Sequence, residues 1–261
     1  MTRLIAAVCA LAGLAVAPFA AAQTPPAQTF GAAYAVRIYG MTAGQFDLSV
    51  KLDGAGGYEA ATVQRTTGLV RSIVGDKQDY QASARGIITA DAVRPSTYQH
   101  QGGRRNRLVK VTYGASDVVT TAQPAFGSMG DPPATREQKI GSTDNVSSFV
   151  DMLLAPGASN PCARTIRVFD GRARFDLVMK PNGTQDIHTR AWKGKAYRCT
   201  VQYKPIAGFS APEPGEDRPT DDPLTFLFAP LPGGLFAPVR IEWPTDGAGL
   251  AIMEAKSFSR S

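Results

Sequence analysis

The eight residues Gln45-Phe46-Asp47-Leu48-Ser49-Val50-Lys51-Leu52 decide the fold class. Polar and apolar side chains alternate through the whole stretch. Successive side chains of a strand point to opposite faces, so this alternation indicates a strand with one buried face. The rest of the chain must then supply the other strands of a sheet.

Similar short segments lie on both sides of this strand, separated by turns rich in glycine. We predict strands at 34–38, 58–66, 77–84, 96–101, 107–113 and 118–122. A second series is predicted at 165–169, 172–179, 184–190 and 196–203, with turns at 170–171, 181–183 and 193–194. Two final strands near 239–243 and 250–258 bring the total to about thirteen. Short strands joined by such turns predict an antiparallel meander.

One segment, residues 144–154, departs from the two-residue period. Its apolar residues fall three and four positions apart, at Val146, Phe149, Val150, Leu153 and Leu154. Thr143 or Asp144 can cap its start, and the Pro-Gly pair at 156–157 can end it. The predicted fold class is therefore mainly β: a strongly curved antiparallel sheet, half-barrel or barrel-like, with one amphipathic helix packed on it.

The start of the chain has the pattern of a secretory signal peptide. Arg3 is followed by an apolar run to Phe19 and by three alanines at 20–22. The run is shorter than the roughly 20 residues that a membrane-spanning helix needs. We therefore expect a signal peptide over 1–22, a flexible N-terminus over 23–29 and a single β-rich domain over 30–261, located in the periplasm.

Removal of this segment changes the cysteine count and the charge. Of the three cysteines, Cys9 would be lost, leaving Cys162 and Cys199, and the net charge of +6 would fall to +5 with the loss of Arg3. An even pair in an oxidising compartment predicts a disulfide between Cys162 and Cys199. A hydrophobic fraction of 43% and a charged fraction of 19% exclude a wholly disordered chain, a collagen, a coiled coil and a polytopic membrane protein.

The residues that common enzyme mechanisms require are largely missing from the sequence. Only two histidines occur, His100 and His188, so a histidine-rich metal site cannot form. The nucleophile elbow, the zinc-protease motif and the phosphate-binding loop are all absent from the sequence. Asp186 and His188 share a strand face, but such a pair is typical of a protein surface. We therefore expect no enzymatic activity, no cofactor and no metal site.

Three segments are candidates for binding. A proline-rich, acidic loop over 205–223 is either a flexible loop or a lid. An apolar cluster follows it and is either core or the wall of a site for an apolar ligand, namely Phe226, Phe228, Leu231 and Phe236. A basic hairpin tip is either solvent-exposed or a contact for an anionic surface, through Arg104, Arg105 and Arg107. Nucleic acid is not an expected partner, because no aromatic residues accompany these arginines.

Several short motifs of the sequence resemble those of a known family. The most specific is Asp170-Gly171-Arg172-Ala173-Arg174-Phe175-Asp176, and others are Tyr34-Ala35-Val36 with Gly44, Asp144 with Ser147, Cys199 with 203–208 (YKPIAG), and 238–241 (PVRI). Together they are similar to the exported bacterial family catalogued as domain of unknown function 3108. The resemblance implies a periplasmic β-rich domain with no established activity and supplies no catalytic residues.

Two functional hypotheses from different classes follow. The first is a binding or carrier module for a lipid or another apolar ligand held on the concave face of the sheet. The second is a structural or interaction protein of the cell envelope with no ligand cavity, which contacts a protein partner or an anionic membrane surface through its strand edges or its basic hairpin.

Overall fold

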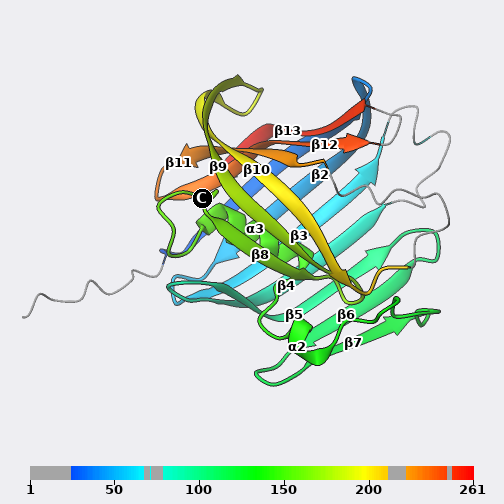
Figure 1. Ribbon diagram of the computed structural model, residues 1–261. Helices are drawn as coiled ribbons and strands as arrows, with labels where there is room; N and C mark the ends of the chain where they lie inside the picture. The colour runs from blue at the N-terminus through cyan, green and yellow to red at the C-terminus, as the bar shows by residue number, and fades with distance from the viewer. Residues whose placement is uncertain (1–24, 68–70, 72–78, 211–221, 246–248) are drawn as a thin grey trace, which may run out of the picture.

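The computed structural model describes residues 25–67, 71, 79–210, 222–245 and 249–261. Thirteen described strands form one antiparallel sheet in the order β7-β6-β5-β4-β3-β2-β1-β13-β12-β11-β10-β9-β8. The sheet is curled and open, and α3 lies on its concave side (Figure 1). This is the curved, mainly β fold with an amphipathic helix that the sequence predicts. The expected signal peptide, residues 1–22, lies outside the described residues.

The first seven strands form one continuous meander. They are β1 (Gln28–Ile38), β2 (Met41–Leu52), β3 (Gly57–Thr66), β4 (Tyr80–Ile88), β5 (Val93–Gly102), β6 (Arg107–Tyr113) and β7 (Val118–Gln123). The alternating stretch that defines β2 pairs with β1 and β3 on either side, and its Leu48, Val50 and Leu52 side chains are buried in the core. β1 begins two residues before the expected start of the domain at residue 30.

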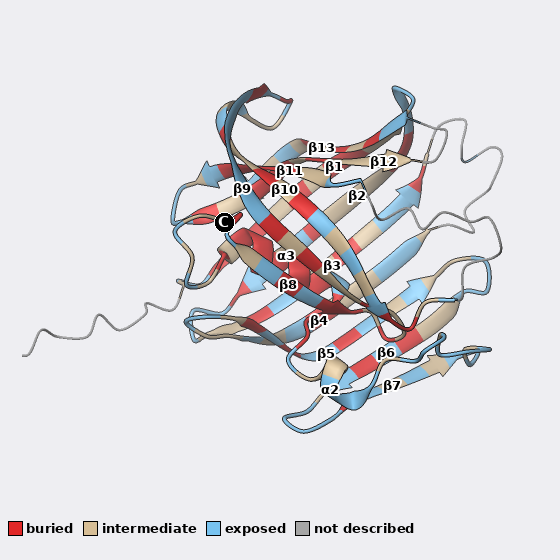
Figure 2. Ribbon diagram, in the orientation of Figure 1, coloured by how far each residue is buried: buried red, intermediate tan, exposed pale blue. Residues whose placement is uncertain are grey.

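The chain then crosses to the other edge of the sheet through two helices. The short α2 (Arg136–Lys139) begins at a capping box on Thr135. The longer α3 (Asn145–Leu154) is the predicted amphipathic helix, capped by Asp144 and ended by Ala155 in the left-handed conformation. Three side chains of α3 are buried in the main core: Val146, Val150 and Leu153. The curled sheet surrounds this side of the helix (Figure 2).

The second meander returns to the first strand. It consists of β8 (Arg164–Phe169), β9 (Arg174–His188), β10 (Lys193–Ala207), β11 (Leu224–Leu231), β12 (Leu235–Thr245) and β13 (Gly249–Arg260). β13 pairs with β1, from Phe30 opposite Arg260 to Ile38 opposite Ala251. The loop expected over 205–223 begins later, because residues up to Ala207 belong to β10, and 211–221 lie outside the described residues.

The predicted strand count of about thirteen agrees with the structure only because two errors cancel. The turn predicted at 181–183 does not reverse the chain, and 174–188 is the single strand β9. One extra residue of β9 is absorbed there as a bulge, since Tyr197 pairs with Thr184 while Cys199 pairs with Pro181. The long β10 offers a partner along the whole of β9, which overrides the local turn preference.

The strand β11 was missing from the predicted strands, because its residues do not alternate. Phe226 and Phe228 pack in the main core. Leu227 and Ala229 belong to a second, smaller cluster with Ile187 and other buried residues. A strand that is buried on both faces is apolar throughout and has no period to detect.

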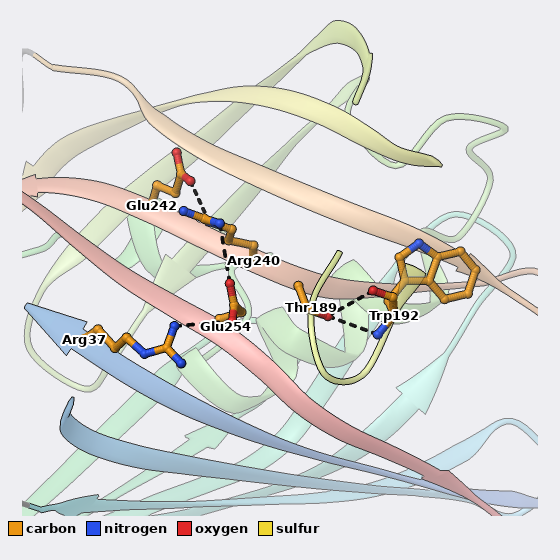
Figure 3. A network of polar contacts seen from close by, with 6 residues as sticks. All are labelled: Arg37, Thr189, Trp192, Arg240, Glu242 and Glu254. Carbon is orange, nitrogen blue, oxygen red and sulfur yellow. Dashed lines mark hydrogen bonds and ion pairs between the residues drawn. The ribbon is translucent and has the colours of Figure 1, made fainter. Parts of the chain in front are cut away.

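A chain of charged side chains spans the seam where the first and last strands meet. Glu254 of β13 lies 3.4 Å from Arg37 of β1 and 3.4 Å from Arg240 of β12, and Arg240 lies 2.6 Å from Glu242 (Figure 3). Met253 and Ala255 beside Glu254 are in the core, so these charges lie on the face turned away from α3. Ion pairs as exposed as the one between Arg37 and Glu254 contribute roughly 0–1 kcal/mol each to stability. The network therefore mainly supports the register in which β1, β13 and β12 pair.

The predicted disulfide between Cys162 and Cys199 is confirmed. The two Cα atoms lie 5.2 Å apart, and the cysteines are 37 residues apart in sequence. The bond joins the segment before β8 to the middle of β10, two strands away in the sheet. The disulfide therefore ties the residues that lead into the edge strand β8 to β10.

Within the described residues, no helix combines the length and the apolar character needed to cross a membrane.

Candidate functional site

A cleft of about 740 Å³ lies on the concave side, between the sheet and the start of α3. Strands β2 to β5 form its floor, the β5–β6 hairpin and the β8–β9 turn form its mouth, and α3 forms one wall. The floor and the wall carry the aromatic rings of Phe46, Tyr98 and Phe149. Phe46 and Phe149 are in ring contact, with centroids 5.1 Å apart. The cleft therefore has an apolar aromatic interior bounded by two different elements.

The mouth of the cleft is basic. Arg104, Arg105, Arg107 and Arg172 line it. Arg107 is held in place, because its Nε donates to the carbonyl of Pro124 at 2.8 Å and its guanidinium lies 4.5 Å from the centre of the Phe126 ring. Arg104 and Arg105 are exposed at the hairpin tip. The structure thus places the three predicted arginines at one opening and adds Arg172 from a distant part of the sequence.

The segment 170–176 forms the side of the mouth that faces the β5–β6 hairpin. Asp170 Oδ1 accepts hydrogen bonds from the backbone N–H groups of Arg172 at 2.8 Å and Ala173 at 2.7 Å, which closes the β8–β9 turn. Gly171 has φ +102°, and a Cβ at this position would lie 2.7 Å from Val109 Cγ1. Only glycine allows this turn to approach β6 so closely. The turn brings Arg172 over the concave face of the first meander.

Arg174, in the same segment, has a structural role. Its side chain is buried, with 3% exposed, and forms an ion pair with Asp176 at 2.6 Å. Its Nε donates to the carbonyl of Gln138 at 2.8 Å, which ties β9 to α2. Burial lowers the pKa of Arg174, and Asp176 opposes that shift. The segment 170–176 therefore contains Arg172, which lines the cleft, and Arg174, which stabilises the fold.

Two titratable side chains, His100 and Tyr98, lie together in the interior of the cleft. The Tyr98 hydroxyl forms a hydrogen bond with His100 Nδ1 at 2.9 Å. Burial lowers the pKa of His100, while Asp170 raises it and Arg107 lowers it. Burial also raises the pKa of Tyr98 well above its usual value. At neutral pH both groups are uncharged, so the floor stays neutral while the mouth is positive.

A buried polar network anchors the helix that forms the wall. Asp144 is fully buried, and its Oδ1 accepts hydrogen bonds from the backbone N–H groups of Val146 at 2.9 Å and Ser147 at 2.8 Å. The Ser147 hydroxyl donates to Asp144 Oδ2 at 2.6 Å and lies 2.6 Å from the Tyr58 hydroxyl of β3. Burial raises the pKa of Asp144 to about 6, although the hydrogen bonds from Ser147 and Val146 oppose the shift. The network fixes the position of Phe149 one turn later.

The other sequence-derived candidates lie elsewhere. Phe226 and Phe228 are buried in the main core, with ring centroids 6.2 Å apart. Leu231 and Phe236 are half-buried beside the core. None of these four side chains lines the cleft. Contact between them and a ligand stays a prediction. Asp186 and His188 are both exposed, and in the described part of the chain no group of acidic, histidine or cysteine residues is arranged to hold a metal ion.

A second hollow, of about 520 Å³, lies on β1 to β6 alone. Short side chains such as Ser49, Ala61 and Ser83 line it. Among the described residues, only these strands line the hollow, so it does not enclose a ligand between two walls. The cleft at α3 is the better candidate site.

Comparison with known proteins identifies the family. The family model described as protein of unknown function (DUF3108) matches residues 33–254. The chain belongs to this family. No curated protein matches the chain. Among solved structures, the 2.0 Å resolution structure of the hypothetical protein CT021 from Chlamydia trachomatis is similar over 87% of this chain and 86% of that one, with 10% identity and a TM-score of 0.35.

Proposed function

We propose that this member of the DUF3108 family is an exported binding module for an amphiphilic, lipid-like ligand. The acidic head of the ligand would lie at Arg104 and Arg105, and its apolar chain would lie along Phe46 and Phe149. One observation carries the proposal: a single cleft combines exposed guanidinium groups at its mouth with aromatic rings in its interior.

The dimensions and the charges of the cleft support this ligand class. Sites for small ligands have volumes of roughly 300–1,000 Å³ and are mainly apolar with a few polar groups. Guanidinium groups form charge-assisted, two-pronged hydrogen bonds with carboxylate or phosphate. The neutral His100 and Tyr98 beneath the mouth can add hydrogen bonds without repelling an apolar chain.

The proposed location outside the cytoplasm rests on a different observation. The Cys162–Cys199 disulfide is a kind of bond that forms and persists in oxidising compartments. Together with the signal-peptide pattern over 1–22, it supports export to the periplasm. A protein there can meet lipids and other amphiphiles of the envelope.

The proposal can be tested with a fluorescent fatty acid. Dansyl-undecanoic acid should bind to the purified protein with increased emission, and its methyl ester, which lacks the charge, should bind more weakly. Hydrogen bonds to a charged group contribute about 1.5–3 kcal/mol each, so the double charge reversal Arg104→Glu with Arg105→Glu should weaken binding of the acid by at least about ten-fold.

A matched control is available at another exposed hairpin tip. Arg190 and Lys193 lie at the β9–β10 turn, away from the cleft. Reversing both of their charges should leave the affinity for the fatty acid unchanged. Equal effects of the two double variants, or no binding of the acid by the wild type, would refute the proposal and favour an envelope interaction protein with no ligand.

A further inference from the structure

The mouth of the cleft carries a surplus of positive charge. Four arginines line it: Arg104, Arg105 and Arg107 come from the β5–β6 hairpin, and Arg172 comes from the β8–β9 turn. Asp170 is the one carboxylate among the described residues that line the cleft. Four guanidinium groups and one carboxylate give the lining a formal charge of +3. A ligand head with a single negative charge would balance only part of it.

The rest of the described chain does not neutralise these arginines. Seven other arginines form ion pairs with carboxylates, but in the part of the chain that the structure describes none of these four does. The contacts of Arg107 are with two backbone carbonyls and the Phe126 ring, and Arg172 donates to the Ser210 hydroxyl at 3.2 Å. Asp131 and Asp222 are exposed but do not line the cleft. Within the described chain, the positive charge of the mouth is left for a ligand.

Arg172 adds donors on the side of the mouth that faces the hairpin. Among the described residues, Nη2 is the only side-chain nitrogen of Arg172 with a hydrogen-bond partner. A guanidinium has five N–H donors in a fixed planar fork, so most of them remain for acceptor atoms of a ligand. The turn that carries Arg172 is fixed by the hydrogen bonds of Asp170. Donors therefore stand on two sides of one opening.

We infer that the head of the ligand is a phosphate monoester, which makes the ligand a phosphorylated amphiphile. The inference rests on the proposed function, and the apolar chain keeps its place along Phe46 and Phe149. A phosphate monoester carries a charge of about −1.5 to −2 at pH 7 and has three strong acceptor oxygens. A carboxylate has a single charge and pairs with one guanidinium fork. The three oxygens of a phosphate can accept from Arg104 or Arg105 and from Arg172 together.

Calorimetric titration of the full chain with ligands of one chain length tests this head group. Decyl phosphate, decyl sulfate and decanoate are compared below their micelle concentrations at about pH 7.5, where the phosphate is mainly doubly charged. Decyl phosphate should bind at least about ten-fold more tightly than either of the other two. Decyl sulfate has a tetrahedral head with one charge, so it separates the effect of charge from that of shape. Inorganic phosphate, which lacks the chain, should bind at least about a hundred-fold more weakly than decyl phosphate.

Two matched variants locate the preference for phosphate. Arg172→Gln should lower the preference for decyl phosphate over decanoate to about three-fold or less, because one side of the mouth loses its charge. Arg190→Gln is the control, since Arg190 is exposed at the β9–β10 turn and does not line the cleft. Its preference should equal that of the wild type. If Arg172→Gln does not fold, Arg104→Gln with Arg105→Gln tests the exposed side of the mouth with the same ratio.

The outcomes separate this inference from the proposed function. Equal binding of decyl phosphate and decyl sulfate, equal preferences in Arg172→Gln and Arg190→Gln, or binding of inorganic phosphate as tight as that of decyl phosphate would overturn the inference. If decanoate binds as tightly as decyl phosphate, the inference alone is wrong and the proposed function stands. If none of the three amphiphiles binds, the proposed function itself is wrong.

Discussion

The buried carboxyl of Asp144 should make the stability of this protein fall as the pH rises. Its pKa is about 6 in the folded chain and 3.8 as the ordinary value. Between these two values the folded state holds a proton that the unfolded state has released. The free energy of unfolding therefore decreases with increasing pH in this range. The substitution Asp144→Asn keeps an oxygen to cap α3 and removes the ionisation.

The magnitude follows from the difference between the two pKa values. A difference of about 2 pH units corresponds to about 3 kcal/mol of stability when the carboxyl is fully ionised. Between about pH 4.5 and pH 7 the wild type should lose about 2 kcal/mol of this through Asp144. The Asp144→Asn variant should lack this loss, so its stability relative to the wild type should rise by about 2 kcal/mol over the same range.

Urea unfolding at the two pH values measures this difference. His100 titrates in both proteins, so its contribution cancels when the variant is compared with the wild type. Asp186→Asn is the control, because Asp186 is exposed on β9 and should leave the pH dependence as in the wild type. Parallel pH dependence of the Asp144→Asn variant and the wild type would show that the buried carboxyl is not the source of the effect.

Two further predictions concern the fold. Replacing Cys162 and Cys199 by serine should lower the melting temperature by about 10 °C in calorimetry, because closing a loop of 37 residues stabilises the fold by about 4 kcal/mol. A wild-type protein whose melting temperature is unchanged by reductant would contradict this. Gly171→Ala should destabilise the chain by about 3 kcal/mol in urea unfolding, through left-handed strain and contact with Val109. Gly183→Ala, also at positive φ but in open space, should cost only about 1 kcal/mol. Equal losses at the two glycines would rule out the contact with β6 as the reason.

Local patterns in the sequence were sufficient for most of the elements. The alternation over 45–52 predicts β2, and the three- and four-residue spacing over 146–154 predicts α3, because both patterns depend only on which face of an element is buried. The pairing of Cys162 with Cys199 followed from the small number of cysteines. The turn predicted at 181–183 and the missing β11 were errors of one kind, since in both cases a neighbouring strand or cluster decides the outcome.

The candidate site could be predicted only in part. The basic tip at Arg104 and Arg105 is visible in the sequence, as are the separate apolar positions of Phe46 and Phe149. Nothing in the sequence places them in one cleft. Their meeting depends on the curl of the sheet and on Gly171, which lets the β8–β9 turn approach β6 and brings Arg172 to the mouth.

By itself, the sequence determined the fold class, the helix, the disulfide pair and the basic hairpin of this protein, because each depends on local periodicity, on composition or on the only available partner. The tertiary structure alone decided that β9 is one strand, that β11 is buried on both faces, and that arginines and aromatic rings from distant parts of the chain share one cleft. These features depend on contacts between residues far apart in the chain, and such contacts form only when the sheet curls around α3.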